Sequence, residues 1–365
     1  MWWRRIDAAM LGWHRAHSGD QTMLIVQLTP EDIRDIKSLA TEIAERYTSV
    51  EDPAFLEGAP TYSQELPRSL RRRLNRFRLV EPSGVCLIRG YPVDQERIGR
   101  TPANWKAKPV PSPTIEQDLV FFLCSGLLGD PIGWATQQQG YILHDILPIK
   151  GHEAEQMGSG SEAPLLWHTE DAFHPYRTDY LGLMCLRNPD AVETTYASME
   201  DVRLDEETAR ILREPHFTIR PDESHLAKNR SDLWCDVGAS DDLLRRAYER
   251  IDRMNTQPER VAVLFGDPTA PYVRIDPFFM ERPTDDSDAA RALDTIVAAI
   301  DDKITGVALQ PGDMLFLDNS RAVHGRKPFK ARYDGTDRWL RRLNIARDLR
   351  KSRDSRPRPD CRIIF

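Results

Sequence analysis

Two histidines and one glutamate are the residues of this sequence best suited to metal chemistry. His168 and Glu170 are separated by a single residue, and His324 follows more than 150 residues later. Two imidazoles and one carboxylate form the set that binds non-haem Fe(II) on one side and leaves the opposite coordination positions open. Alternate residues of a strand point to the same face, so we expect His168 and Glu170 to bind one metal ion while Thr169 points away.

The context of His324 strengthens this hypothesis, because an isolated His-x-Glu pair is a weak signal. The run from Asp313 to Asp318 is apolar and typical of a strand, and it ends in a polar turn just before His324. Five other histidines, by contrast, are expected to be surface groups or hydrogen-bonded core groups; they are His144, His152, His174, His216 and His225.

A basic strand is expected over residues 338–345, fourteen residues after His324. At a period of two residues, Arg338 and Arg342 share one face of this strand, and Arg341 lies on the other. Arg338 and Arg342 either face solvent, as is usual for one side of an antiparallel sheet, or point into a barrel. In a barrel each guanidinium requires a carboxylate, because its desolvation costs several kcal/mol, and a bound acid would meet that need. The residues by themselves leave both interpretations open.

The composition indicates a globular protein without a strong electrostatic partner. The chain has 365 residues, 40% of them hydrophobic, and a net charge of −7, which argues against a general nucleic-acid binder. No apolar run approaches the length that crosses a membrane. Five scattered cysteines without a C-x-x-C spacing are typical of reduced thiols in a cytoplasmic protein.

The sequence predicts a mainly β fold with flanking helices (α+β) and a double-stranded β-helix core, the jelly roll of cupins. Many short strands with long excursions, and metal ligands on separate strands, favour this architecture. A helix is expected to begin at Thr29, which is followed by proline and acidic residues. We expect an N-terminal leader over 1–28, with Met1 or Met23 as the start, one oxygenase domain over 29–350 with lid loops at 151–164 and 221–240, and a loosely attached C-terminal tail over 351–365.

Several longer motifs make the chain resemble the clavaminate synthase-like group of Fe(II)/2-oxoglutarate-dependent oxygenases. Within that group it is most similar to free amino-acid hydroxylases of the viomycin-type L-arginine β-hydroxylase kind. The similarity covers roughly residues 25–355, and the matching segments are 129–138, 147–151, 167–173, 186–190, 321–326 and 332–340.

The resemblance implies an iron ion with 2-oxoglutarate and O2 as cosubstrates. His168, Glu170 and His324 would bind the iron, and no further catalytic side chain is implied. Arg338 would pair with the distal carboxylate of 2-oxoglutarate. A threonine after the strand that ends near Leu186 would assist it; Thr195 is the first choice and Thr194 the alternative.

The resemblance also implies the substrate contacts, and it favours the inward orientation of both arginines. Gln137 and Glu170 would hold the substrate amino group, and Arg342 its carboxylate. Arginine-hydroxylating relatives have an Asp-x-Asp pair, whereas this chain has Asp276 followed by Phe278. One carboxylate suits a cationic side chain such as arginine or lysine about as well as the neutral citrulline.

The expected activity is therefore hydroxylation of the β- or γ-carbon of a free L-amino acid with a long polar side chain, in specialised-metabolite or antibiotic biosynthesis. The partner would be this small molecule rather than a nucleic acid or a membrane. Two alternatives remain: a same-fold oxygenase that performs desaturation or cyclisation, and a non-catalytic cupin-like metabolite-binding protein.

Overall fold

Two β-sheets face each other in the computed structural model, which describes residues 23–106, 109, 111–229, 232–233, 241–283 and 287–365. The larger sheet has the order β1 (Leu24–Gln27), β2 (Val85–Arg89), β14 (Met314–Asp318), β6 (Tyr180–Arg187), β16 (Trp339–Ala346), β3 (Asp130–Trp134) and β17 (Ile363–Ile364), with β4 (Leu143–Ile146) also paired to β16. The smaller sheet has the order β13 (Thr305–Val307), β7 (Thr194–Ser198), β15 (Ala322–Arg326) and β5 (Leu165–His168).

The space between the two sheets is filled by alternating apolar side chains. Leu183 on β6, Leu315 on β14 and Leu340 on β16 point inward from the larger sheet and pack in one cluster with Tyr196 on β7 of the smaller sheet. Alternation of this kind is what a half-buried strand requires, and it defines the interior of a double-stranded β-helix. The predicted mainly β fold with flanking helices is confirmed.

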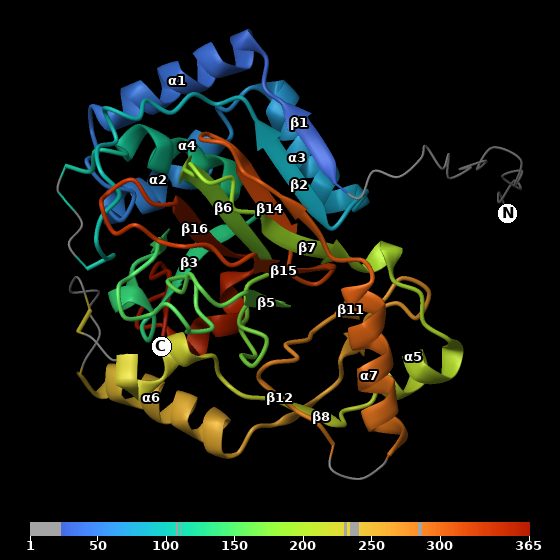
Figure 1. The fold of residues 1–365 in the computed structure, drawn as a ribbon. Coiled ribbons are helices and arrows are strands. Elements are labelled where there is room, and N and C mark those ends of the chain that lie inside the picture. The colour runs from blue at the N-terminus through green and yellow to red at the C-terminus, as the bar shows by residue number, and fades with distance from the viewer. Residues whose placement is uncertain (1–22, 107–108, 110, 230–231, 234–240, 284–286) are drawn as a thin grey trace, which may run out of the picture.

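Helices cover the outer faces of both sheets (Figure 1). Thr29 caps the first helix as predicted, because its hydroxyl accepts a hydrogen bond from the Asp32 N–H and the Asp32 side chain accepts one from the Thr29 N–H. Hydrophobic side chains of four helices pack against the larger sheet in one buried cluster. Hydrophobic side chains of two further helices pack against the smaller sheet in a second cluster. The helices are α1 (Pro30–Ala44), α2 (Pro53–Ser63), α3 (Arg68–Val80), α4 (Ile115–Gly126), α5 (Glu206–Leu212), α6 (Asp241–Thr256) and α7 (Asp288–Asp301).

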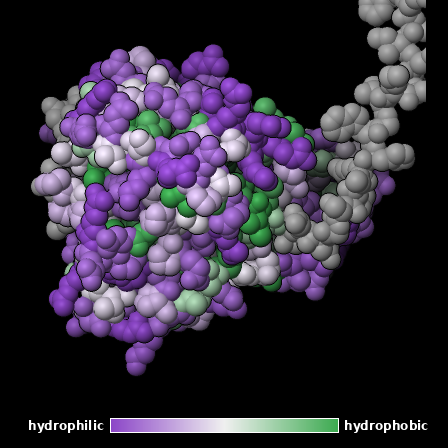
Figure 2. Space-filling model, turned by 90° about the horizontal axis from the view of Figure 1, so that it is seen from above, coloured by the Kyte–Doolittle hydropathy of each residue, from purple (hydrophilic) through white to green (hydrophobic). Residues whose placement is uncertain are grey.

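The outer face of the helical cover is mainly hydrophilic, with hydrophobic side chains in small groups (Figure 2). Short strands and 3₁₀ helices complete the connections. They are β8 (Phe217–Ile219), β9 (Arg260–Val261), β10 (Leu264–Phe265), β11 (Tyr272–Val273), β12 (Met280–Glu281), η2 (Gln138–Gly140), η3 (Met199–Asp201), η4 (Glu223–His225), η5 (Ala227–Asn229) and η6 (Leu349–Ser355).

Both predicted end segments need correction. Strand β1 pairs in parallel with β2, so residues 24–27 belong to the larger sheet rather than to a separate leader; residues 1–22 lie outside the described part of the chain. The prediction of a loosely attached tail over 351–365 is wrong. Strand β17 pairs with β3, Phe365 is buried, and Arg356 donates to the carbonyl oxygens of Leu349, Pro359 and Cys361.

Candidate active site

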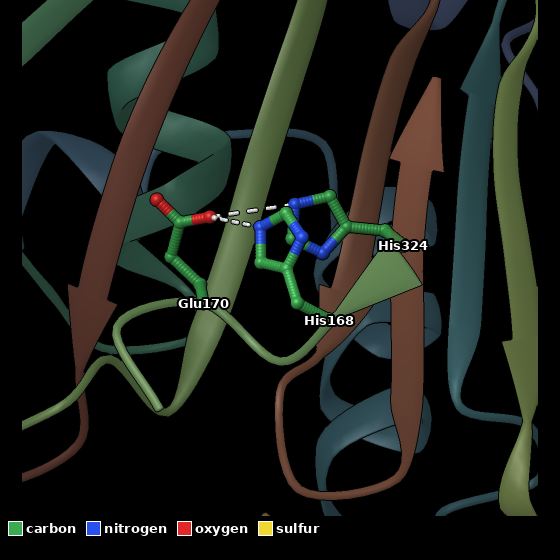
Figure 3. Close-up of side chains that lie close together, drawn as sticks. All are labelled: His168, Glu170 and His324. Carbon is green, nitrogen blue, oxygen red and sulfur yellow. Dashed lines mark ion pairs between the residues drawn. The ribbon is translucent and has the colours of Figure 1, made fainter. Parts of the chain in front are cut away.

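The three predicted metal ligands meet at one end of the smaller sheet. His168 is the last residue of β5, and it lies directly opposite His324 of β15 in the antiparallel register. Glu170 stands in the turn that follows β5, so the turn as well as the strand brings its carboxylate back toward the two rings. Figure 3 shows this carboxylate facing both imidazoles.

The geometry of these side chains fits a single ion. The Glu170 Oε2 atom is 3.6 Å from His168 Nε2 and 3.3 Å from His324 Nε2. Adjacent ligand atoms around a metal with bonds of about 2.1 Å are separated by about 3 Å in octahedral geometry. The residues present therefore fit an iron ion bound on one face by two nitrogens and one carboxylate oxygen.

Hydrogen bonding orients His168 for this role. Its Nδ1 atom lies 2.8 Å from the carbonyl oxygen of Leu166, which can only accept, so Nδ1 carries the proton. The lone pair of Nε2 is then free to face the metal position. A carbonyl partner on the remote ring nitrogen is the usual way in which proteins fix the tautomer of a metal-binding histidine.

Electrostatics keep Glu170 ionised. Burial alone would raise its pKa, but Arg342 and the two histidines outweigh burial and hold the pKa of Glu170 well below its usual range. For His168 burial lowers the pKa, yet the hydrogen bond to Glu170 and the charge of Asp276 raise it to about 9. Burial and the neighbouring His168 lower the pKa of His324. A cation at this place would displace the proton from His168, because only neutral imidazole binds metal.

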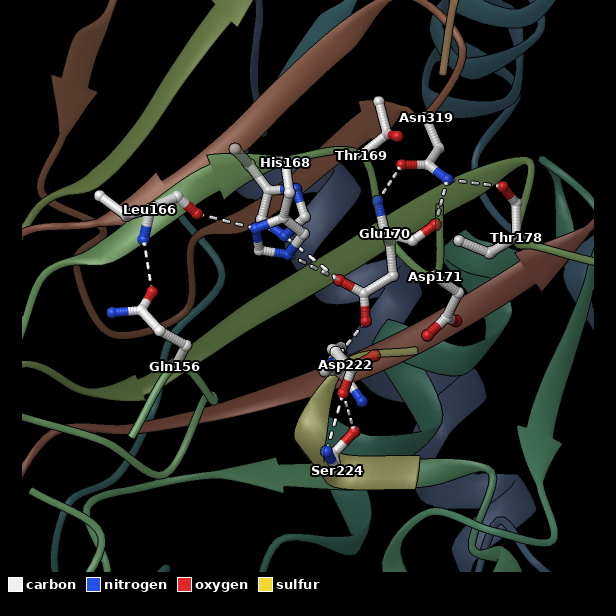
Figure 4. Close-up of polar contacts among 12 residues, drawn as sticks. Gln156, Leu166, His168, Thr169, Glu170, Asp171, Thr178, Asp222, Ser224 and Asn319 are labelled. Atoms are coloured by element: carbon white, nitrogen blue, oxygen red, sulfur yellow. Dashed lines mark hydrogen bonds and ion pairs between the residues drawn. The ribbon is translucent and has the colours of Figure 1, made fainter. Parts of the chain in front are cut away.

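Asn319 holds the backbone of Glu170 from the end of β14. Its Oδ1 atom accepts from the Glu170 N–H at 2.7 Å, and its Nδ2 atom donates to the carbonyl oxygens of Glu170 at 2.9 Å and Thr178 at 2.8 Å (Figure 4). Thr169 points away from the metal side, as predicted. Its hydroxyl donates a hydrogen bond to the Ile275 carbonyl oxygen and accepts one from the Ile275 N–H. The turn that carries Glu170 is therefore tied to two other segments.

Asn319→Ala is expected to lower the affinity for Fe(II) about 10-fold or more, the range found when partners of metal ligands are removed. The substitution leaves the buried amide and carbonyl of Glu170 without partners, which loosens the turn. Isothermal titration with Fe(II) under anaerobic conditions measures the effect. Asn188→Ala is the matched control, because Asn188 makes the same three kinds of backbone contact at Val192 and Leu309 but lies away from the metal. Equal Fe(II) affinities in the two variants would refute the role of Asn319.

Arg338 is buried, 5% exposed, just before β16. One of its terminal nitrogens donates to the Thr194 hydroxyl at 3.3 Å, and burial lowers its pKa to about 10. The hydroxyl beside Arg338 is thus that of Thr194, whereas the first-choice Thr195 stands one residue further along β7 and faces Gly306 of β13 and Gly325 of β15 in the ladder. The one-residue difference reverses the side of the strand, which decides which threonine reaches the arginine.

Arg342 lies inside the cavity as well, and protein groups hold it there. It donates to Glu170 Oε1 at 2.5 Å, to Gln137 Oε1 at 2.8 Å and to His144 Nδ1 at 2.7 Å. Gln137 in turn donates to the Ser224 hydroxyl at 2.6 Å. The Nε atom of Arg342 is buried and has no hydrogen-bond partner within the described part of the chain.

One cavity of about 400 Å³ is lined by the metal triad and by Gln137, Thr194, Arg338 and Arg342. Its size is typical of small-molecule sites. Asp276 also lines it and is 7% exposed. Burial raises the pKa of Asp276 to about 6, and among the described residues no basic side chain forms an ion pair with it. Phe278 contributes a half-exposed ring to the same wall. The cavity thus presents a carboxylate without an ion-pair partner among the described residues, next to an aromatic surface.

Both predicted lid loops border this cavity. Segment 151–164 contributes His152, Gln156 and Ser159, and Gln156 is joined to β5 because its side chain accepts from the Leu166 N–H. Segment 221–240 contributes Asp222, Ser224 and its neighbours, while its positions 230–231 and 234–240 lie outside the described residues. The lid function of both segments stays a prediction.

A second group of possible metal ligands consists of Asp171, Asp222 and His225. Its atoms already have protein partners: Asp171 accepts from the Trp134 indole at 2.7 Å and lies 3.1 Å from His225, whose other ring nitrogen contacts Thr136. His225 is therefore a hydrogen-bonded core group, as the sequence suggested.

The chain matches the model of the taurine catabolism dioxygenase TauD, TfdA family over residues 61–344. The chain belongs to this family. An enduracididine beta-hydroxylase of Streptomyces hygroscopicus is 52% identical over 94% of this chain and 100% of that protein. An L-ornithine/L-arginine 3-hydroxylase of Catenulispora acidiphila is 45% identical over 93% of this chain and 98% of that protein.

The oxygenase also resembles a solved structure over almost its whole length. This structure is the non-haem iron oxygenase OrfP in complex with Fe, succinate and (3S)-hydroxy-L-Arg, and its sequence is 43% identical. The alignment covers 93% of this chain and 99% of the OrfP chain, with a TM-score of 0.86. Further complexes of OrfP hold Fe with alpha-ketoglutaric acid and Fe with L-Arg. The predictions of a clavaminate synthase-like family, of an amino-acid hydroxylase, and of iron with 2-oxoglutarate are confirmed. No helix in the described ranges is both long and apolar enough to cross a lipid bilayer.

Some residues of the site were not found by sequence reasoning. Asn319 could have been recognised, because it is a polar side chain that follows an apolar strand and lies close in sequence to a metal ligand. Ser224 and Asp222 lay in a segment that was recognised only as a lid. Arg326 carried no signal beyond its place two residues after His324.

Proposed function

We propose that this oxygenase hydroxylates the β-carbon of a free L-amino acid with an arginine-type side chain. The observation that carries the proposal is one cavity that is lined by the metal triad, by the buried Arg338 and the partly buried Arg342, and by Asp276, which forms no ion pair with a described basic side chain. A zwitterion with a basic side chain presents the complementary charges. The similarity to enzymes named as beta- and 3-hydroxylases supports the choice of carbon.

Iron and 2-oxoglutarate supply the activation of O2, and the side chains provide binding, orientation and exclusion of water. Arg338, with Thr194 rather than Thr195, binds the distal carboxylate of the cosubstrate. Gln137 and Glu170 orient the substrate amino group, and Arg342 orients its carboxylate. Arg342 is rigidly held by its protein contacts, so it offers a preorganised donor at little cost in side-chain entropy.

Asp276 and Phe278 form the subsite for the substrate side chain. A single carboxylate makes a charge-assisted pair with one edge of a planar guanidinium. The Phe278 ring provides a face over which a cation gains about 0.5–1 kcal/mol at an exposed position. This combination favours a delocalised, flat cation over the compact ammonium of lysine.

A panel of free amino acids tests the proposal. Succinate release and product mass are measured with arginine, enduracididine, homoarginine, ornithine, lysine and citrulline. A guanidine-type substrate that gains one oxygen, located by NMR at the β-carbon, is the expected result. Loss of two hydrogens would assign the predicted alternative of desaturation or cyclisation, and absence of succinate with every amino acid would favour a binding protein.

Asp276→Asn is expected to lower kcat/KM for the best cationic substrate about 10- to 100-fold, because a charge-assisted hydrogen bond contributes about 1.5–3 kcal/mol. Citrulline, which has the same shape without the charge, serves as the matched control in the same variant. Its kcat/KM is expected to change less than about threefold. If both substrates lose activity equally, Asp276 does not bind the cationic group.

The proposal extends to location and pathway. A cytoplasmic location is supported by the buried free thiols of Cys86, Cys124, Cys185 and Cys361. A role in specialised-metabolite biosynthesis is supported by the family resemblance of the chain.

A further inference from the structure

Besides Arg338 and Arg342, a third arginine lines the cavity, and it is buried. Arg326 is the last residue of β15, two positions after His324, and is 4% exposed. Its terminal nitrogens donate to the carbonyl oxygens of Ser161 at 3.1 Å, Lys327 at 3.1 Å and Ala163 at 3.0 Å. Within the described part of the chain, no carboxylate forms an ion pair with Arg326, and its Nε atom has no hydrogen-bond partner.

Arg326 lies next to the proposed cosubstrate anchor. In the ladder between β15 and β7 it faces Thr194, and the hydroxyl of Thr194 accepts from Arg338. Arg338 has the same deficit, because it too is buried, forms no ion pair with any described residue, and has an unpartnered Nε atom. Two buried guanidinium groups on either side of one threonine repel each other and lack an anion.

The contacts of Arg326 also reach the segment that borders the cavity. Ser161 and Ala163 belong to segment 151–164, and the Ser161 carbonyl oxygen accepts a second hydrogen bond, from the Phe329 N–H at 2.8 Å. Neutral carbonyl oxygens solvate a guanidinium only in part. A carboxylate that binds beside Arg326 would neutralise its charge. It would thereby stabilise both the neighbouring Arg338 and the contacts of Arg326 with segment 151–164.

We propose that Arg326 acts together with Arg338 in binding the distal carboxylate of 2-oxoglutarate, and that Arg326 thereby couples cosubstrate binding to the ordering of segment 151–164. The inference rests on the proposed function, since it concerns the cosubstrate of the same site. The competing explanation is that Arg326 is only a structural clamp for the segment.

Two ligands separate these explanations: 2-oxoglutarate, and 2-oxopentanoate, which has the same chain length but a methyl group in place of the distal carboxylate. Each is titrated anaerobically into protein saturated with Fe(II), and binding is followed by the charge-transfer absorption band. Arg326→Met is expected to weaken 2-oxoglutarate about tenfold or more and to leave 2-oxopentanoate within about twofold. Arg338→Met is the reference variant and is expected to show the same selectivity with a larger loss.

A structural clamp would weaken both ligands equally or neither, and either result overturns the proposal. Arg326→Lys is the conservative variant: it keeps the positive charge, so its loss of 2-oxoglutarate affinity is expected to be smaller than that of Arg326→Met. A wild-type protein that binds neither 2-oxo acid would instead refute the proposed function, which is a different outcome from failure of the Arg326 inference.

Hydrogen exchange on the wild-type protein provides a test that needs no variant. With Fe(II) bound, 2-oxoglutarate is expected to slow amide exchange in segment 151–164 by at least about threefold more than 2-oxopentanoate does. Equal protection by both ligands would show that the distal carboxylate has no link to the segment, and would overturn the coupling.

Discussion

Glu170→Gln is expected to lower the Fe(II) affinity more than about 100-fold, beyond the usual effect of losing a partner of a metal ligand. The amide oxygen still accepts from Arg342, whose contact with Glu170 Oε1 is 2.5 Å, so the cavity keeps its fold. The variant side chain lacks the negative charge that would balance the Fe(II) ion bound by the two histidines. Fe(II) content after anaerobic dialysis and calorimetric titration measure this change independently of turnover.

Glu200→Gln is the matched control for this experiment. Glu200 is another partly buried glutamate held by an arginine, at 2.7 Å from Arg321, but it does not line the cavity. Its Fe(II) affinity is expected to equal that of the wild type. If Glu170→Gln retains wild-type affinity as well, the carboxylate is not a ligand and the two histidines bind the metal without it.

Arg341→Met is expected to lower the free energy of unfolding by about 3–5 kcal/mol, the usual cost of removing one partner from a buried ion pair. Arg341 lies on the face of β16 opposite the cavity arginines and donates to Asp118 at 2.9 Å, to Thr114 at 2.6 Å and to Asp145. The substitution leaves two carboxylates that are almost inaccessible to solvent without this cation. Urea unfolding followed by circular dichroism gives the free energy.

Arg210→Met provides the comparison for stability. Arg210 of α5 also contacts two carboxylates, Glu207 of the same helix and Glu214 just after it, but all three side chains are exposed. Exposed pairs of this kind contribute about 0–1 kcal/mol. A loss below about 1 kcal/mol in Arg341→Met, indistinguishable from that of Arg210→Met, would show that the buried network does not stabilise the fold.

The strand β16 illustrates how far sequence reasoning reaches. Its period of two placed Arg338 and Arg342 on one face, and both are indeed inside the cavity. Periodicity could not tell which face was the inner one, because the other face holds Arg341 and is also buried. Only the position of Asp118 on α4, far away in the sequence, explains how a second charged face can lie in the protein interior.

The His-x-Glu pair illustrates the same limit. The spacing was right, but β5 ends at His168, and Glu170 reaches the metal position through a turn held by Asn319 and Thr169. Likewise the choice between Thr194 and Thr195 depends on which side of β7 faces Arg338. The tail beyond residue 350 looked detached because its charges are many, yet buried contacts pair them with carbonyl groups and with Asp130.

The sequence by itself indicated the three candidate metal ligands and the jelly-roll core, because these follow from residue type, spacing and alternation along single segments, and it indicated the family through the resemblance of longer motifs. Only the tertiary structure decided which donors converge on the cosubstrate and which backbone groups hold the ligands. Those contacts join residues separated by more than a hundred positions, such as Asn319 and Glu170. Their geometry arises from sheet register and turn conformation, which no local pattern encodes.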